Sequence, residues 1–400
     1  MAPMNHPSWW GAPKNFNDRK QERKVSWLEL FYDLVYVAAI SQLTHQLTAH
    51  TTWSQLSYLL LLFCMIFWSW VNGSQFYDLH GSDSIRTRLL TFWQMLGVAA
   101  IAISIQDAFQ GNYKTLTFSF AFIEIMITYL WWSVGFWDPS HRQFSRFYTN
   151  NFLIAFGLLI VSAFVENKYV TPIWIVVLLL NLTPGLIGAR AIVRGIKERG
   201  QIFSASETIV ERFGLFTIIV LAESILGTVS GVAEIKDKQP MAWIAFTLGI
   251  LISFLLWSIY FDMTSEQETK PGYKYYLSLV FLHFPLLFAL GVIGACMKVL
   301  LEDMQAGIHL IVLWIFCIAI AVMLLMIVFL TTIMKQAEED RSYIRPTVKV
   351  LITISAIVLL IPLFAKWLST PVFLLLITLL LLVPVLIGVI SWIRYKVKID

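Results

Sequence analysis

The chain reads Thr171-Pro172, then Pro184-Gly185-Leu186-Ile187-Gly188, then Arg194, and near its end it reads Thr370-Pro371, then Pro384-Val385-Leu386-Ile387-Gly388, then Arg394. The offsets among proline, glycine and arginine are identical in the two copies, and only the Thr-Pro pair shifts by one residue. The two halves also open alike, with Glu29-Leu30-Phe31 and Glu211-Arg212-Phe213. This repetition predicts an internal duplication, which in a membrane protein places the functional site at the interface between the repeats.

The composition indicates a membrane protein, because 58% of the 400 residues are hydrophobic and 14% are charged. The apolar residues form runs of about 20, the length that crosses roughly 30 Å of hydrocarbon as a helix. A membrane β-barrel would instead alternate apolar and polar residues. We therefore predict an all-α polytopic membrane protein with about twelve transmembrane helices, at 26–48, 53–73, 89–108, 115–137, 148–166, 170–193, 208–231, 241–261, 275–297, 308–334, 348–365 and 370–393.

The duplication divides the predicted helices into two groups of six. The expected organisation is an N-terminal arm at 1–25, a first six-helix repeat at 26–204 and a second at 205–400. Since six is an even number, both repeats have the same orientation and are parallel. Pro184 and Pro384 fall inside the last helix of each repeat, where a proline removes one backbone hydrogen bond and produces a kink or a hinge.

The basic residues follow the predicted membrane sides. With both termini cytoplasmic, 22 of the 29 Lys and Arg residues lie on the cytoplasmic side, as the positive-inside rule requires. The arm lacks the apolar core of a signal peptide, so it is expected to remain as a cytoplasmic segment. The net charge of +4 thus reflects topology and does not indicate nucleic-acid binding. Six lysines fall on the other side: Lys114, Lys168, Lys236, Lys238, Lys298 and Lys366.

Signatures of common enzymes and cofactor sites are absent from the sequence. There is no H-E-x-x-H, G-x-S-x-G, Walker A or G-x-G-x-x-G motif. The seven histidines show no metal-ligand spacing, and the three cysteines lie inside apolar runs without C-x-x-C spacing. We therefore expect no enzymatic activity, no cofactor and no metal, and we name the lipid bilayer and an unidentified small solute or ion as partners.

Ionisable residues inside a membrane helix are expensive, and by default they indicate a functional site. In the first predicted helix, Glu29, Asp33, Tyr36 and Thr44 fall within about 80° of one another on the helical wheel. Glu29 also has a structural explanation, because Ser26-x-x-Glu29 is a capping box. Asp33 lies about one turn deeper, where capping does not account for it.

The first helix of the second half carries Arg212 and Glu223 on one face, about 16 Å apart along the axis. Each therefore needs a partner on another helix, and Arg212 with Asp33 or Glu29 is one such pairing. Its alternatives are a functional pathway or a purely structural ion pair. Glu124 and His283 lie inside further predicted helices and together would suit proton relay. Asp107 is another candidate, near the end of a helix.

Two stretches resemble a known family. Trp27-Leu28-Glu29-Leu30-Phe31-Tyr32-Asp33-Leu34-Val35-Tyr36-Val37 and Arg212-Phe213-Gly214-Leu215-Phe216, continuing to Glu223-Ser224-Ile225-Leu226, resemble the motifs of the bacterial low temperature requirement A family. The resemblance implies a polytopic, all-helical inner-membrane protein associated with growth in the cold. It implies no established substrate, and it assigns Glu29, Asp33, Arg212 and Glu223 to the family's charged motif positions.

A second resemblance concerns mechanism. Glu29-x-Phe31-x-Asp33-x-Val35 is similar to the opening helix of potassium channels marked by a Phe-Ser-Asp motif, although Tyr32 stands where those channels have serine. It implies that the helices at 26–48 and 208–231 are central to the molecule. The preferred interpretation is a transporter or channel for a small solute or ion, with proton coupling as one form. The alternatives are an envelope factor in lipid or membrane homeostasis and a scaffold for other membrane proteins.

Overall fold

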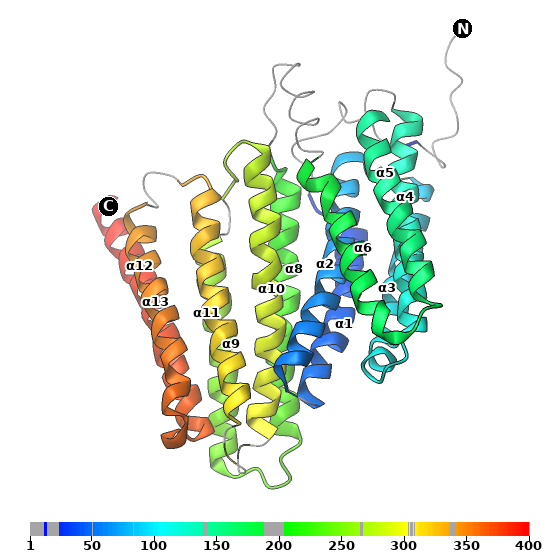
Figure 1. The fold of residues 1–400 in the computed structure, drawn as a ribbon. Helices are drawn as coiled ribbons and strands as arrows, with labels where there is room; N and C mark the ends of the chain where they lie inside the picture. The colour runs from blue at the N-terminus through cyan, green and yellow to red at the C-terminus, as the bar shows by residue number, and fades with distance from the viewer. Residues whose placement is uncertain are drawn as a thin grey trace. The chain divides into compact units, whose positions relative to one another are not determined.

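The computed structural model describes residues 12–13, 24–49, 51–82, 84–138, 142–187, 204–264, 267–302, 304, 307, 309–336 and 341–399. Its regular structure is helical, apart from one isolated bridge between Thr269 and Met334, so the predicted all-α class is confirmed for this part of the chain (Figure 1). The elements are α1 (Trp27–Ala49), α2 (Trp53–His80), α3 (Ile85–Phe109), α4 (Lys114–Trp137), α5 (Arg142–Ser162), α6 (Asn167–Ile187), α8 (Glu207–Ala233), α9 (Pro240–Thr264), α10 (Tyr273–Glu302), α11 (Leu310–Ile333), α12 (Arg341–Leu360), the 3-10 helix η4 (Ile361–Trp367) and α13 (Thr370–Ile399).

Ten segments of the described chain are long and apolar enough to cross a membrane. The expected runs at 26–48 and 148–166 also form helices, α1 and α5, but neither helix is apolar enough to be counted among these ten segments. The reason is their polar content: α1 contains two acids near its start, and α5 contains Arg142 and Arg146 with two asparagines. These two helices therefore need protein neighbours around their polar residues more than the other helices do.

Local backbone chemistry explains how α3 begins and ends. The Ser84 hydroxyl accepts a hydrogen bond from the Thr87 amide at 3.3 Å, which caps the first turn. At the other end, Gly111 has a φ of 89°, a left-handed conformation that glycine adopts without strain. Its amide donates to the Ala108 carbonyl, and the Asn112 amide donates to the Asp107 carbonyl. This is a Schellman motif, and it turns the chain toward α4 after only a few residues.

The chain divides into two compact units. Unit 1 comprises Met1–Leu43, Leu60–Arg212 and Pro271–Leu277, and unit 2 comprises Thr44–Leu59, Phe213–Lys270 and Ser278–Asp400. The main division, between Arg212 and Phe213, lies near the predicted repeat boundary, although two short segments belong to the opposite unit. The interpretation of the two halves as duplicated parallel repeats stays a prediction that rests on the sequence pattern.

Packing in unit 1 follows chain order, with α3 against α4, α4 against α5, and α5 against α6 (Figure 1). The α4–α5 contact is close at Gly135, which has no side chain. A Cβ at this position would lie 2.5 Å from the Ser145 hydroxyl. Beside it, Trp131 of α4 stacks on Tyr148 of α5 with ring centroids 4.4 Å apart. Small residues and stacked rings supply the dispersion contacts that hold helices together where lipid removes the hydrophobic driving force.

Unit 2 contains a backbone-to-backbone contact between α8 and α10. A Cβ at Gly227 would lie 2.0 Å from the Gly294 carbonyl oxygen, and one at Gly231 would lie 2.7 Å from the Lys298 carbonyl oxygen. Gly227 and Gly231 form a G-x-x-x-G pair, the motif that allows two membrane helices to approach closely. Elsewhere in this unit, α9 packs against α13 and α11, and α12 packs against α11 and α13.

The two repeated prolines both lie within helices, Pro184 in α6 and Pro384 in α13. Gly188 and Arg194 of the first copy, and most of the arm at 1–25, lie outside the described residues. Near Pro184, the Asn181 carbonyl accepts a hydrogen bond from Trp68 and the Gly185 carbonyl accepts one from the Tyr273 hydroxyl, both at 2.8 Å. The kink or hinge at each proline stays a prediction.

Candidate functional site

The expected capping box begins α1. The Ser26 hydroxyl accepts a hydrogen bond from the Glu29 amide at 3.3 Å, and Glu29 Oε2 accepts one from the Ser26 amide at 2.9 Å. This reciprocal pair satisfies two backbone donors at the start of the helix. The structural explanation for Glu29 is therefore present, but it uses only one of the two carboxylate oxygens. The other, Oε1, lies 3.6 Å from Arg212 Nη1.

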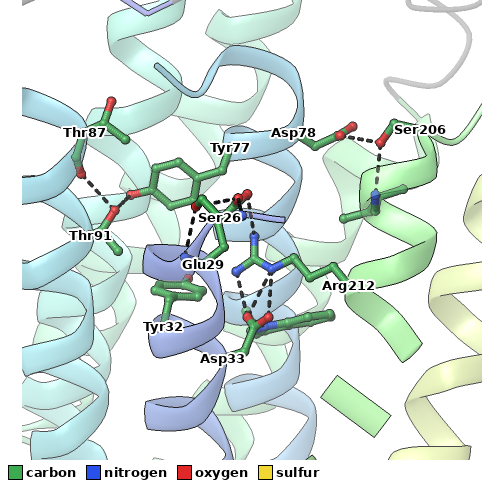
Figure 2. Close-up of polar contacts among 12 residues, drawn as sticks. Ser26, Glu29, Tyr32, Asp33, Tyr77, Asp78, Thr87, Thr91, Ser206 and Arg212 are labelled. Carbon is green, nitrogen blue, oxygen red and sulfur yellow. Dashed lines mark hydrogen bonds and ion pairs between the residues drawn. The ribbon is translucent and has the colours of Figure 1, made fainter. Parts of the chain in front are cut away.

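Arg212 and Asp33 form a buried ion pair, the pairing that the sequence suggested (Figure 2). Arg212 Nη2 donates to Asp33 Oδ1 at 2.7 Å, and Arg212 Nε donates to Oδ1 and Oδ2 at 3.1 and 3.0 Å. The Asp33 side chain is 0% exposed and that of Arg212 is 1% exposed. Glu29, Asp33 and Arg212 together are called the ionic cluster below. All three belong to unit 1.

Aromatic side chains enclose the guanidinium and the carboxylate. Trp70 Nε1 of α2 donates to Asp33 Oδ1 at 2.6 Å, and the Arg212 guanidinium carbon lies 5.3 Å from the Tyr32 ring centroid and 5.7 Å from the Trp70 ring centroid. Charge-assisted hydrogen bonds and cation–π contacts of this kind offset the cost of removing the charges from water. Sequence reasoning missed Trp70, because nothing in an aromatic run distinguishes a carboxylate donor from a packing residue.

Arg212 lies between two carboxylates of α1, with Asp33 hydrogen-bonded to Nη2 and Nε and with Glu29 Oε1 3.6 Å from Nη1. Among the described residues, Nη1 has no partner at hydrogen-bond distance. The second acid gives Arg212 an alternative partner, so that a cation binding at one carboxylate would leave the guanidinium held by the other.

A network of hydroxyl and amide groups extends from Tyr32 across α2 and α3. The Tyr32 hydroxyl lies 3.2 Å from the Tyr36 hydroxyl and 3.3 Å from Gln94 Oε1. Gln94 and Thr91 both donate to the Tyr77 hydroxyl, at 2.9 and 2.6 Å. Because a tyrosine hydroxyl carries one proton, Tyr32 donates to only one of its two neighbours at a time. Rotation of the hydroxyl therefore switches the direction of the network.

A second polar contact positions the start of α8 and thereby the backbone that carries Arg212. The Ser206 hydroxyl accepts a hydrogen bond from the Ile209 amide at 3.1 Å and donates to Asp78 Oδ1 at the end of α2 (Figure 2). Ser206 thus caps α8, which satisfies an amide that would otherwise have no acceptor. The sequence signal for this cap was Ser206 immediately before Glu207, and it was not identified.

The remaining predicted residues lie at separate places. Tyr36 lies beside the ionic cluster in the hydroxyl network, whereas Glu124 of α4 lies in unit 1 next to Asn181. Glu223 and His283 belong to unit 2. The structure therefore does not place Glu124 and His283 together in one unit. Asp107 is exposed at the end of α3.

His283 has both ring nitrogens engaged. Nδ1 lies 2.8 Å from the Leu279 carbonyl oxygen, and Nε2 lies 2.9 Å from the Tyr260 hydroxyl of α9. A carbonyl oxygen only accepts, so Nδ1 carries a proton and Nε2 pairs with Tyr260. This arrangement is a hydrogen bond between helices within unit 2. Among the described residues, no group of three or more His, Cys, Asp or Glu is arranged to hold a metal ion.

Long apolar helices that bury a guanidinium between carboxylates define a multi-pass α-helical membrane protein. The family model for the bacterial low temperature requirement A protein (LtrA) matches residues 24–386, and the chain belongs to this family. An uncharacterized protein of Rhizobium meliloti is 25% identical over 286 residues, which is 68% of each chain. Both resemblance motifs lie inside the region matched by the family model.

Proposed function

We propose that this protein moves a small ion or solute across the bacterial inner membrane, without enzymatic chemistry, and that the ionic cluster lies on its pathway. Both termini are cytoplasmic in this proposal, which the distribution of Lys and Arg supports. The name of the family supports a role in growth at low temperature. The envelope-factor alternative would explain a cold phenotype through lipid, but no described cluster of residues favours it over transport.

The single observation that carries the proposal is a buried guanidinium in contact with two carboxylates of one helix. Asp33 and Glu29 share Arg212, with Asp33 fully buried and Glu29 reaching the guanidinium at 3.6 Å. Two arrangements of the cluster are therefore available, one with Arg212 held by Asp33 and one with Arg212 held by Glu29. A cation that neutralises one carboxylate biases the equilibrium between them, which is the requirement for a ligand to drive a conformational change.

Ion flux into proteoliposomes tests the proposal. Purified protein is reconstituted, gradients of K⁺, Na⁺ or H⁺ are imposed, and flux is compared with empty liposomes. We expect flux from the wild-type protein that is lost in Asp33→Asn and reduced in Glu29→Gln. Asp237→Asn is the matched control, because Asp237 is an exposed residue in the loop between α8 and α9. This variant should transport as the wild type does.

Folding is measured on the same preparations, since a variant that does not fold loses flux trivially. Glu29→Gln is the more informative variant, because glutamine can also complete a capping box. Loss of flux in a correctly folded Glu29→Gln protein supports the proposal. No flux from wild-type protein under any gradient, or equal flux from wild type and both cluster variants, would refute it and favour the lipid alternative.

A further inference from the structure

A small polar cavity lies inside unit 1, apart from the ionic cluster. Residues of α2, α4, α5 and α6 line it, and the polar members are Ser69, Asn72, Glu124 and Asn181. The cavity offers ≈ 20 Å³ to the centre of a water molecule, which is room for about one water. Its other walls are apolar and include Phe120.

Among the residues that the structure describes, two oxygen atoms at this cavity have no hydrogen-bond partner. Asn181 Nδ2 donates to Glu124 Oε2 at 2.9 Å, which leaves Glu124 Oε1 and Asn181 Oδ1 buried and unpaired. The Glu124 side chain is nearly inaccessible, with 7% of the residue exposed. In the part of the chain that the structure describes, no Lys, Arg or His forms an ion pair with Glu124. An ionised carboxylate here would be a buried charge without a counter-charge.

Both unpaired atoms are acceptors when Glu124 is ionised, so one added proton satisfies them together. A proton on Oε1 makes Glu124 a donor toward Asn181 Oδ1, directly or through one water in the cavity. Asn181 Nδ2 continues to donate to Oε2. The carboxylic acid and the amide then exchange two hydrogen bonds, and the buried charge disappears.

A line of hydroxyl groups connects this cavity with the surroundings of the ionic cluster. Ser69 lines the cavity, its Oγ lies 3.2 Å from the Tyr36 hydroxyl, and that hydroxyl lies 3.2 Å from the Tyr32 hydroxyl. The Tyr32 ring in turn contacts the Arg212 guanidinium. Each hydroxyl can accept one hydrogen bond and donate another, although the Ser69 proton is donated to the Ile66 carbonyl at 2.8 Å in this structure.

We propose that Glu124 is a proton-binding site and that H⁺ is the coupling ion of the transport cycle. The carboxylate takes a proton from hydronium, forming one O–H bond and releasing one water molecule, and no oxidation or reduction occurs. The proton leaves by the reverse step, in which the Oε1–H bond breaks and a water molecule in the cavity becomes hydronium. The coupling part rests on the proposed function, whereas proton binding at Glu124 does not.

Infrared difference spectroscopy on reconstituted protein tests the site without any transport. We expect wild-type protein at neutral pH to show the carbonyl-stretch band of a protonated carboxylic acid, absent from Glu124→Gln and shifted in D₂O. Glu166→Gln is the matched control and should retain the band, because Glu166 is exposed and pairs with Lys168 at 2.6 Å. The band should weaken as pH is raised and shift in Asn181→Leu, which removes the amide partner.

Glu124→Gln should fold as well as the wild type, because glutamine reproduces both hydrogen bonds of the protonated acid to Asn181. A band that Glu124→Gln leaves unchanged, or one that neither titrates nor exchanges with D₂O, would overturn the proton site. Higher thermal stability in Na⁺ or K⁺ than in choline, lost in Glu124→Gln, would also overturn it, in favour of a metal-cation site.

Flux separates the two proposals. Uptake that responds to a pH gradient in the wild type and no longer does so in Glu124→Gln supports coupling to H⁺. A titrating Glu124 band in protein that shows no flux under any gradient would end the transport proposal and leave the proton site standing. Flux that depends on Asp33, in protein that lacks the Glu124 band, would support the transport proposal and overturn the proton site at Glu124.

Discussion

Neutralising the charged residues of the ionic cluster one at a time is expected to destabilise unit 1 by unequal amounts. With all three residues ionised, the cluster has one guanidinium between two carboxylates. Asp33→Asn and Glu29→Gln each leave one acid beside Arg212, whereas Arg212→Met removes the guanidinium that both acids contact. The order of destabilisation should therefore be Arg212→Met, then Asp33→Asn, then Glu29→Gln.

The magnitudes follow from the geometry. Arg212→Met removes three hydrogen bonds to Asp33 and should cost about 5 kcal/mol, the upper part of the range for breaking a buried pair. Asp33→Asn keeps one oxygen for Trp70 or for Arg212 and leaves the guanidinium beside Glu29, so about 3 kcal/mol is expected. Glu29→Gln loses a contact at 3.6 Å but can keep its cap, so about 1 kcal/mol is expected.

Combining the substitutions tests the same reasoning more strictly. Asp33→Asn with Arg212→Met should cost less than the sum of the two single changes, by up to about 3 kcal/mol, because the charges left unpaired in each single variant are then both absent. Adding Glu29→Gln removes the last charge and should bring stability closer to that of the wild type. Thermal unfolding in detergent, followed by circular dichroism, gives the order. Additive losses, or a larger loss in Glu29→Gln than in Arg212→Met, would refute the charge argument.

Three further test substitutions and one control follow from individual contacts. Gly227→Ala should destabilise the protein by about 2 kcal/mol, because its Cβ would lie 2.0 Å from a carbonyl oxygen of α10; Gly157→Ala, which meets nothing within 4 Å, should be neutral or stabilising in the same melting experiment. Trp70→Phe removes the indole donor to the buried carboxylate and should cost about 2 kcal/mol, and an unchanged melting temperature would contradict that donor role. Gly73→Ala would place a Cβ 2.1 Å from the Tyr32 hydroxyl, so we expect reduced flux in folded protein, and wild-type flux would show that this hydroxyl is not needed.

Much of the fold could be predicted from the sequence, because a membrane-spanning helix requires a continuous run of apolar residues. All twelve expected runs correspond to helices among the described residues. Apolarity alone does not identify α1 and α5 as membrane spans, because both helices carry polar residues that only tertiary contacts explain. The G-x-x-x-G pair of Gly227 and Gly231 is present in the sequence, but its spacing alone does not show which helix it contacts.

The site was predictable to the extent that burial of charge demands a partner. Because a buried acid needs a counter-charge, Arg212 could be predicted as a partner of Asp33 although 179 residues separate them in the sequence. It did not lead to Trp70, Gln94 or Tyr77, because neutral donors occur throughout the chain and spacing alone does not show which of them meet a given acid. Glu124 was predicted as a buried acid. Its partner Asn181 lies on α6 and becomes apparent only from the tertiary structure, in which α5 packs against both α4 and α6.

The separation of Asp33 from Arg212 along the chain also has a consequence for biosynthesis. At about 5–20 residues per second, the ribosome makes Arg212 roughly 10 to 40 s after Asp33. During this delay Asp33 lacks the guanidinium that pairs with it, in a helix that is not apolar enough to qualify as a span by itself. We therefore expect α1 to enter the bilayer late, or to wait beside the insertion machinery, until the second turn of α8, which carries Arg212, emerges.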